Sequence, residues 1–308
     1  MSLVSMSKLL ADAKRGGYAV CYCESWNLES FQAVVEAAEE ECSPIIAGFN
    51  GGFLMHSRRR RAENLGSYAA LGLTLTKARV PAALILNESA SLAQIEEAID
   101  SGFNAVMVEN GGLELEDYRR MVRQVVAKAH RSGVSVEAQV GHLADASCNG
   151  RGEPTTPQAA RAFVEETGID ALAVAVGNVH ILTKGSAPLD LEALREIGSV
   201  VSVPLVLHGG TGIPLQEAGH LIRRGVAKVN FGTGLKQTYL AAVRERLAKY
   251  QEPMSPHPFI GIGGEDDIMV AAREAVKLKC QELLRAYGSA GKAGTEEQTT
   301  AGPRKFWN

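Results

Sequence analysis

Two histidines, His180 and His208, stand where two neighbouring strands are expected to end, and this placement suits the binding of a metal ion. Neighbouring strands of a sheet lie about 4.8 Å apart, so imidazoles at matching strand ends can reach one ion. Zinc favours nitrogen ligands and accepts a carboxylate as a third protein ligand, which Glu88 or Glu109 can supply. An isolated histidine is more often a surface or hydrogen-bonded residue. The occurrence of two histidines at matching strand ends is what favours a divalent metal site, with zinc as the most suitable ion.

Two glycine-rich turns suit the binding of a phosphate group. The first runs from His208 to Gly212 and the second from Asn230 to Gly234. Glycine lets backbone N–H groups approach an anion, and threonine hydroxyls add donors. The alternative explanation is two tight turns that need glycine for their backbone conformation. The candidate substrate-binding residues are Gly209, Gly210, Thr211, Asn230, Gly232 and Thr233, with Lys184 available as a countercharge.

Polar side chains also stand at the expected carboxyl ends of the other strands, which the burial of an apolar strand does not require. They are Glu24, Asn50, Asn87, Glu88, Glu109, Asn110 and Gln139. Any one of them is more often structural than functional, because loops are polar anyway. Their convergence at strand ends predicts a site that binds a ligand or a metal.

The elements that position these residues alternate between short apolar runs and longer amphipathic segments, which is typical of parallel strands joined by crossover helices. The expected strands are 18–23, 44–48, 82–86, 105–108, 135–139, 171–176, 204–207 and 228–231. Eight such strands predict an α/β fold of the (β/α)8 TIM-barrel class, and a doubly wound open sheet is the alternative. In such a barrel the active site lies at the carboxyl ends of the strands.

Residues typical of helix starts support the predicted barrel, and the expected helices set the bounds of its domain. Asn27 is a good N-cap for a helix over 28–41, and Pro157 suits the first turn of a helix that ends at Thr167. Further helices are expected over 92–101 and 115–131, with an extra C-terminal helix over 269–287. The prediction is a single barrel domain over residues 1–293, followed by a small, polar, mobile tail over 294–308.

Composition excludes some function classes. The 308-residue chain is 45% hydrophobic and carries a net charge of −3. Such a small net charge argues against a general electrostatic attraction to nucleic acid or to a membrane surface. No apolar run approaches the roughly 20 residues of a membrane span, and Asp12, Lys14 and Arg15 interrupt any signal-peptide pattern. The five cysteines show no zinc-knuckle spacing, so we expect reduced thiols and a cytoplasmic protein.

Five segments together resemble one known family. Residues 203–212 (VPLVLHGGTG) are similar to the segment "IPLVLHGASG" of the class II, zinc-dependent ketose-bisphosphate aldolases, which act on fructose or tagatose bisphosphate. Residues 170–180 resemble their "DALAVAIGTAHG", and 228–233 resemble "KVNIAT". Residues 288–293 and 27–33 resemble "GSAGKA" and "NNLEMLQA". The resemblance runs in one register from about Lys8 to Ala293.

The resemblance implies a metal-dependent carbon–carbon lyase. It would act on a phosphorylated ketose or related carbonyl compound through a metal-stabilised enediolate. His180 and His208 match two zinc ligands of the family, and Lys184 matches the lysine of a loop that closes over the substrate. Gly209, Thr211, Asn230, Gly232 and Thr233 match its contacts with dihydroxyacetone phosphate. A homodimer or homotetramer is also implied.

The expected third strand departs from the family pattern. The family reads "HLDHG" there, whereas this chain reads Ile85-Leu-Asn-Glu-Ser89. The aspartate that exchanges a proton with the substrate becomes Asn87, which has no titratable proton. A zinc-binding histidine becomes Glu88, which can bind metal or carry a proton. The comparison with the family thus makes Asn87, Glu88 and Glu109 the candidate catalytic residues. If Glu88 binds the metal, Glu109 or Asp145 becomes the candidate acid–base group.

Two smaller departures accompany this change, because Gln139 replaces a family glutamate and Ile181 replaces the glycine after the sixth-strand histidine. The residues that match the family's carbonyl- and phosphate-binding positions are thus kept, whereas those at its acid–base positions differ. This pattern favours a site adapted to another reaction or substrate over an inactive one. The alternatives are an isomerase or epimerase that uses the same enediolate, and a non-catalytic sugar-phosphate-binding protein.

Overall fold

Eight parallel strands close into a barrel in the computed structural model, which describes residues 3–147 and 152–294. The strands follow one another around the barrel in the order β1, β10, β9, β7, β5, β4, β3 and β2. Their bounds are β1 Val20–Ser25, β2 Ile45–Asn50, β3 Ala82–Ser89, β4 Ala105–Val108, β5 Ser135–Val140, β7 Ala171–Val174, β9 Leu205–Leu207 and β10 Val226–Phe231. The predicted (β/α)8 class is confirmed, and each expected strand overlaps one of these.

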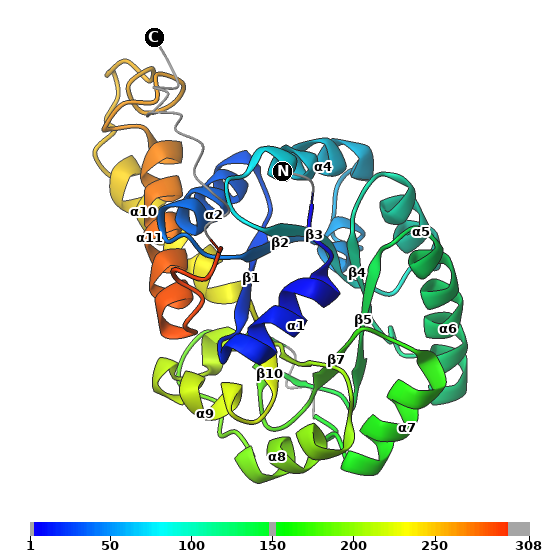
Figure 1. Cartoon of the computed structure of the whole chain (residues 1–308). Coiled ribbons are helices and arrows are strands. Elements are labelled where there is room, and N and C mark those ends of the chain that lie inside the picture. Colours follow the sequence, from blue (N-terminus) through cyan, green and yellow to red (C-terminus); the bar gives the residue numbers. More distant parts are fainter. Residues whose placement is uncertain (1–2, 148–151, 295–308) are drawn as a thin grey trace.

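Helices surround the barrel, as Figure 1 shows. Their bounds are α1 Met6–Gly16, α2 Leu28–Glu40, α3 Gly51–Leu54, α4 Leu65–Gly72, α5 Leu92–Asp100, α6 Leu115–Arg131, α7 Pro157–Thr167, α8 Leu191–Val200, α9 Ala218–Ile222, α10 Thr233–Leu247 and α11 Ile268–Ala286, with short 3-10 turns at Leu73–Lys77, Gly210–Gly212 and Leu215–Glu217. Asn27 caps α2 through the amide of Ser30, as expected, and Pro157 opens α7.

The barrel interior is a core of its own, because alternate side chains of every strand point inward. Large residues such as Tyr22 and Met107 are accommodated among small alanines; the inner strand residues are Val20, Tyr22, Ile46, Ala83, Ile85, Ala105, Met107, Ala171, Ala173, Val206 and Ala227. Helix α1 adds Met6, Leu9 and Leu10 to this cluster and lies across the amino-terminal end of the barrel (Figure 1). That end is therefore closed, and the opposite end carries the polar residues.

One small element differs from the expected arrangement. The strand predicted over 171–176 ends at Val174, and His180 lies outside the barrel on a separate two-residue strand, β8 (Val179–His180). This strand pairs in parallel with β6 (Ala144–Asp145). His180 thus reaches the site from a short ladder beyond β7 and not from the end of a barrel strand, which is a correction to the sequence prediction.

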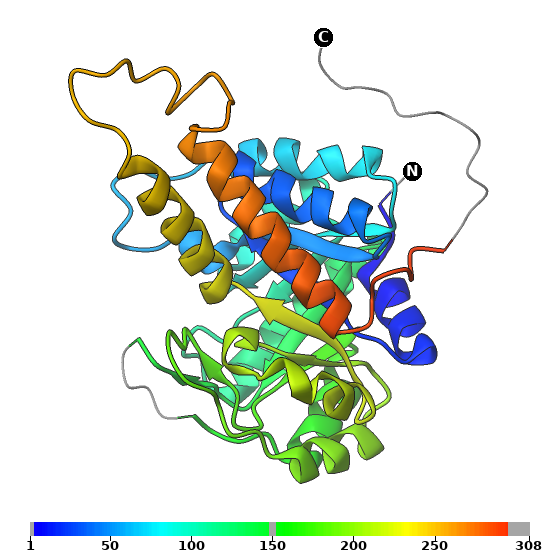
Figure 2. The same ribbon diagram turned by 90° about the vertical axis from the view of Figure 1, so that its left-hand side faces the viewer.

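The predicted extra C-terminal helix is α11, which packs with α10 and α2 on one side of the barrel. Figure 2 shows α10 and α11 side by side, with the loop between them extending away from the barrel. None of the helices in residues 3–147 and 152–294 is long and apolar enough to cross a bilayer. The predicted tail lies outside the described residues from 295 onward, as does Cys148, and Cys21, Cys23, Cys42 and Cys280 are free.

Candidate active site and metal centre

A cavity of about 600 Å³ opens at the carboxyl ends of the barrel strands. Most of the predicted site residues line it: Glu24, Asn50, Asn87, Glu88, Glu109, Gln139, His180, Gly209, Thr211, Asn230, Gly232 and Thr233. His208 is 1% exposed and lies directly behind Glu88. The convergence expected from polar strand ends is therefore present in the structure.

A backbone irregularity in β3 turns two consecutive side chains toward this cavity. The register between β3 and β4 shifts between Leu86 and Ser89, and Glu88 has a φ of 51°. In a regular strand, successive side chains point to opposite faces, so Asn87 and Glu88 could not both line one cavity. A bulge re-aims one of them, and a non-glycine residue held in the left-handed region costs about 1–3 kcal/mol. Strain of this kind is characteristic of functional sites.

His208 is held between two carboxylates. Its Nδ1 lies 2.8 Å from Oε1 of Glu88, and its Nε2 lies 2.8 Å from Oε1 of Glu137. Glu137 in turn accepts a hydrogen bond of 2.7 Å from the Nζ of Lys228, and both side chains are fully buried. Asn50 donates a 2.6 Å hydrogen bond to the other oxygen of Glu88. The ring of His208 is thus fixed in one orientation.

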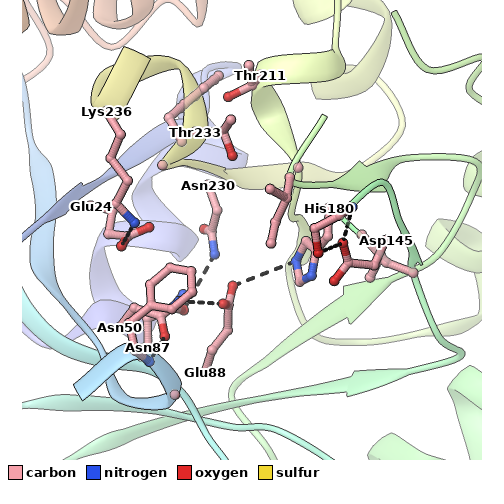
Figure 3. A pocket seen from close by; sticks show the side chains of 18 of the residues that line it. Glu24, Asn50, Asn87, Glu88, Asp145, His180, Thr211, Asn230, Thr233 and Lys236 are labelled. Atoms are coloured by element: carbon pink, nitrogen blue, oxygen red, sulfur yellow. Dashed lines mark hydrogen bonds and ion pairs between the residues drawn. The ribbon is translucent and has the colours of Figure 1, made fainter. Parts of the chain in front are cut away.

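Glu88, His180 and His208 form a group that can hold a metal ion. Each offers one ligand atom, and these atoms lie within 4.8 Å of one another. The Nε2 of His180 is 3.7 Å from Oε1 of Glu88, and Figure 3 shows the two side chains pointing toward one another. Two imidazoles and one carboxylate with an open fourth position are the usual ligands of a catalytic zinc, so the donor set fits a divalent metal.

The charges of this group are tightly coupled. Burial alone would raise the pKa of Glu88, but hydrogen bonding and charge from His208 and His180 hold it well below its ordinary value. Burial would lower the pKa of His208, but its hydrogen bonds to Glu137 and Glu88 raise it to about 9. Burial lowers the pKa of His180. The carboxylates of Glu88 and Glu137 thus both face the ring of His208, and the Nζ of Lys228 pairs with Glu137 although burial lowers the pKa of Lys228.

The two glycine-rich turns also border the cavity, through Gly209, Thr211, Gly232 and Thr233. A side chain at Gly209 would place its Cβ 2.2 Å from the carbonyl oxygen of Val179, and Gly209 has a φ of 69°, so only glycine fits there. Thr211 accepts a hydrogen bond from the N–H of Gly234 in the first turn of α10, and its own hydroxyl proton stays available to a ligand. The close approach of the Val179 carbonyl therefore explains why residue 209 is glycine. The same backbone conformation is compatible with anion binding.

Two predicted substrate-binding residues do not reach the cavity wall. Lys184 is exposed in the loop after β8 and is not part of the lining. Gly210 lies behind the wall, where its Cβ would stand 2.6 Å from the ring of Phe231, and it borders a smaller neighbouring pocket. In this arrangement Lys184 contacts a substrate only if its loop moves.

Glu24 and Lys236 form an ion pair at the edge of the second turn, where Figure 3 shows the two side chains facing one another. A Cβ at Gly232 would lie 2.3 Å from Oε2 of Glu24, so the carboxylate packs against the backbone at the start of α10. Burial raises the pKa of Glu24 to about 7, although Lys236 opposes this shift. Lys236 also lies 4.1 Å from the centroid of the Phe53 ring.

Glu109 and Asp145, the two candidates for the acid–base role, both line the cavity but differ in the surroundings of their carboxylates. Oδ1 of Asp145 already accepts two hydrogen bonds of 2.7 Å, from the N–H and the hydroxyl of Ser147. Burial, reinforced by the charge of Glu88, raises the pKa of Glu109 to about 7. A carboxyl group with this pKa can both accept and release a proton near neutral pH, so its pKa favours Glu109.

Ile181 combines bulk with an unfavourable backbone conformation. It follows His180, lines the cavity and has a φ of 52°, which is a rare conformation for a β-branched residue. The side chain therefore narrows the cavity at a position where the backbone suits glycine.

Replacing Ile181 by glycine should stabilise the protein. Relief of about 1–3 kcal/mol of strain exceeds the entropic cost of about 0.4–1 kcal/mol that glycine adds in the unfolded chain. We expect Ile181→Gly to raise the free energy of unfolding in urea by about 1 kcal/mol. Ile260→Gly, at an exposed position with ordinary φ, is the control and should lower it. An equal loss in both variants would mean that position 181 is not strained.

Several residues of the site were not singled out from the sequence. Tyr22, Phe53, His142 and Lys236 line the cavity, and Lys228 lies beneath it. Tyr22 could have been found, because it stands two residues before Glu24 on the same strand and so shares its face. Lys236 is four residues past Gly232 on a helix, but nothing in its type or spacing separates it from a solvated lysine.

Comparisons with known proteins agree over almost the whole chain. The family described as fructose-bisphosphate aldolase class-II matches residues 4–292. A fructose-bisphosphate aldolase of Geobacillus stearothermophilus is 37% identical over 297 residues, which cover 95% of this chain and 99% of that protein. A fructose-bisphosphate aldolase of Staphylococcus aureus is 34% identical over 304 residues, which cover 95% of this chain and 100% of that protein. Among solved structures, the YdjI aldolase from Escherichia coli K12 has a TM-score of 0.77 and 30% identity, with 95% of this chain and 100% of that chain covered.

Proposed function

The chain belongs to the class II fructose-bisphosphate aldolase family, and from this premise we propose that it cleaves and forms a carbon–carbon bond in a phosphorylated ketose with the help of a divalent metal. The observation that carries the proposal is the group of Glu88, His180 and His208 at the wall of the cavity. Zinc is the metal that this donor set suits best.

Each residue of the group has a definite role in this proposal. His180 would bind through Nε2 and His208 through Nδ1, because Glu137 already holds the Nε2 of His208. Glu88 would supply the third ligand. A metal bound there would polarise the substrate carbonyl and offset the negative charge that develops on its oxygen. Asn87, which is 1% exposed beside Asn230, would hold a substrate oxygen through its amide without exchanging a proton.

Glu109 is the acid–base group in this proposal. In the direction of cleavage, its ionised carboxylate takes the proton of the substrate hydroxyl as the neighbouring carbon–carbon bond breaks. In the direction of condensation, its neutral form returns that proton to the new hydroxyl. The group must be ionised for cleavage, and its pKa is about 7.

We therefore expect Glu109→Gln to reduce kcat by about 10²–10⁴-fold, the usual range for loss of a general acid or base. Cleavage by the wild type should rise with pH through about 7, as Glu109 loses its proton, and this rise should be missing in the variant. Asp145→Asn is the matched control, because Asp145 lines the same cavity with an occupied carboxylate, and it should keep the pH profile. If only Asp145→Asn removes the pH dependence, the two roles are reversed.

The phosphate of the substrate would bind at the two glycine-rich turns. Gly209, Thr211, Gly232 and Thr233 line this side of the cavity, and α10 begins at Thr233. Backbone N–H groups at the start of a helix favour an anion. Asn230 would contact the same half of the substrate. Lys184 would join only after movement of its loop.

The proposal is tested with zinc-loaded protein and a panel of ketose monophosphates and bisphosphates. We expect release of dihydroxyacetone phosphate from at least one of them, loss of that activity with a chelator, and recovery when zinc is restored. His208→Ala should contain less metal than the wild type. Absence of metal from both proteins, or absence of cleavage across the panel, contradicts the proposal.

Asn87 favours a second candidate, an isomerase or epimerase that moves a proton beside the carbonyl without breaking the carbon chain. An amide at this position removes a proton carrier, while the metal-binding group and Glu109 remain. Exchange of the proton next to the carbonyl with solvent deuterium, without cleavage, would identify this activity.

We also propose a homodimer or homotetramer in the cytoplasm, as the family relationship suggests. Leu240 and Leu278 are 65% and 61% exposed on α10 and α11, and their burial against a second copy would remove apolar surface from water.

A further inference from the structure

The phenol of Tyr22 is a buried polar group without a partner. Tyr22 lies in the middle of β1, is 1% exposed, and lines the cavity. Its hydroxyl oxygen makes no hydrogen bond among residues 3–147 and 152–294. An unsatisfied buried hydroxyl costs about 1–3 kcal/mol, and native proteins keep few of them. A hydroxyl in this state beside a substrate cavity indicates a partner that arrives with the ligand.

The surroundings of the ring fix where this oxygen lies. The Nζ of Lys228 is 5.2 Å from the ring centroid, and Lys228 is held in place by Glu137. On the neighbouring strands, Ile46 and Asn230 lie opposite Tyr22 in the register. A phenol oxygen lies on the ring axis, so it cannot be exchanged for another atom by a flip, as the oxygen of an amide can. The oxygen therefore stays in the barrel interior, beside the cavity that Tyr22 lines.

The charges nearby decide the kind of hydrogen bond that this phenol makes. Burial, followed by the carboxylates of Glu24 and Glu88, raises the pKa of Tyr22 well above its ordinary value. The hydroxyl keeps its proton at neutral pH and acts as a donor. Glu109, in contrast, can accept a proton. The two residues thus offer complementary contacts to a compound that carries several oxygen atoms.

We propose that Tyr22 is a substrate-contacting residue whose hydroxyl donates a hydrogen bond to an oxygen of the phosphorylated ketose that becomes negative as the carbon–carbon bond breaks. This inference rests on the proposed function and adds to it a contact from the barrel interior. No proton is transferred, because the phenol donates a hydrogen bond and keeps its proton. A hydrogen bond to an oxygen that gains charge is stronger in the transition state than in the bound substrate, so it accelerates the reaction.

The test compares Tyr22→Phe with Tyr287→Phe. Tyr287 is fully buried and its hydroxyl also lacks a partner among the described residues, but it does not line the cavity. For the zinc-loaded protein and its best ketose phosphate, we expect Tyr22→Phe to lower kcat/KM by about 10- to 100-fold, the effect of losing a hydrogen bond to a charged group. Most of the loss should appear in kcat. Tyr287→Phe should stay within about twofold of the wild type.

Metal content and stability separate a substrate contact from a structural role. Tyr22→Phe should bind the same amount of zinc and unfold at the same or a higher urea concentration, since it loses no internal hydrogen bond. Unchanged kcat/KM in Tyr22→Phe would overturn the inference, and so would an equal loss in both variants. A wild type without turnover on the whole ketose-phosphate panel would instead overturn the proposed function.

Discussion

Replacement of His180 by alanine should remove the divalent metal while the barrel stays folded. His180 lies on the short strand β8, its side chain is 26% exposed, and its Nε2 approaches Oε1 of Glu88 to 3.7 Å. Loss of one of three ligands should weaken metal binding by more than the 10- to 100-fold that loss of an outer partner causes. We expect the purified variant to hold less than about one tenth of the wild-type zinc, measured by elemental analysis, and aldol cleavage to fall at least 100-fold.

His142 provides the matched control for this experiment. It lines the same cavity but is not part of the metal-binding group. His142→Ala should therefore keep the wild-type zinc content. If His180→Ala also keeps it, the metal is held elsewhere or not at all, and the proposed assignment of ligands is wrong. Retention of the wild-type unfolding transition in both variants shows that any loss of metal is a local effect.

The largest effect on stability is expected for Lys228→Met. Lys228 and Glu137 are both fully buried and 2.7 Å apart. Burial alone would raise the pKa of Glu137, but Lys228 and His208 keep it below its ordinary value, so the carboxylate is ionised. Among the residues that the structure describes, removal of the Lys228 side-chain nitrogen leaves this charge with His208 as its remaining hydrogen-bond partner. Breaking a buried pair in this way costs about 3–5 kcal/mol, which should appear in the free energy of unfolding in urea.

The double variant Glu137→Gln/Lys228→Met tests whether the two residues act as a pair. It removes both charges, so it should recover much of the stability that Lys228→Met loses. Lys8→Met is the surface control, because the exposed pair of Lys8 with Asp12 should contribute no more than about 1 kcal/mol. If the double variant is as unstable as the sum of its parts, Lys228 stabilises the barrel through packing and not through charge.

The barrel could be predicted from the sequence because its elements depend on local signals. The run 105–108 is a strand between two amphipathic segments, and the helix over 115–131 has the predicted bounds. Asn27 and Pro157 mark helix starts through their own backbone chemistry. Strand-end positions also identified part of the cavity wall, from Glu24 on β1 to Asn230 on β10, since the strands of a barrel converge at one face.

The remainder depends on contacts between distant parts of the chain. The two-stranded ladder that carries His180 pairs residues more than thirty positions apart, and no local pattern specifies it. The link from Glu137 to His208 spans 71 positions, and the one to Lys228 spans 91. Whether Lys184 reaches the substrate depends on the conformation of an exposed loop, which residue type alone does not determine. These features are set by tertiary packing.

The left-handed backbone at Glu88 also means that the direction and the charge of the proposed third ligand are set separately, the first by the backbone and the second by the side chain. The bulge in β3 directs whatever side chain occupies position 88 toward His180 and His208. The identity of that side chain would then set the total charge around a bound ion: with glutamate the three proposed ligands would carry one negative charge, whereas three imidazoles would carry none. One codon can thus change the Lewis acidity available to the substrate while the coordination position stays where the backbone puts it.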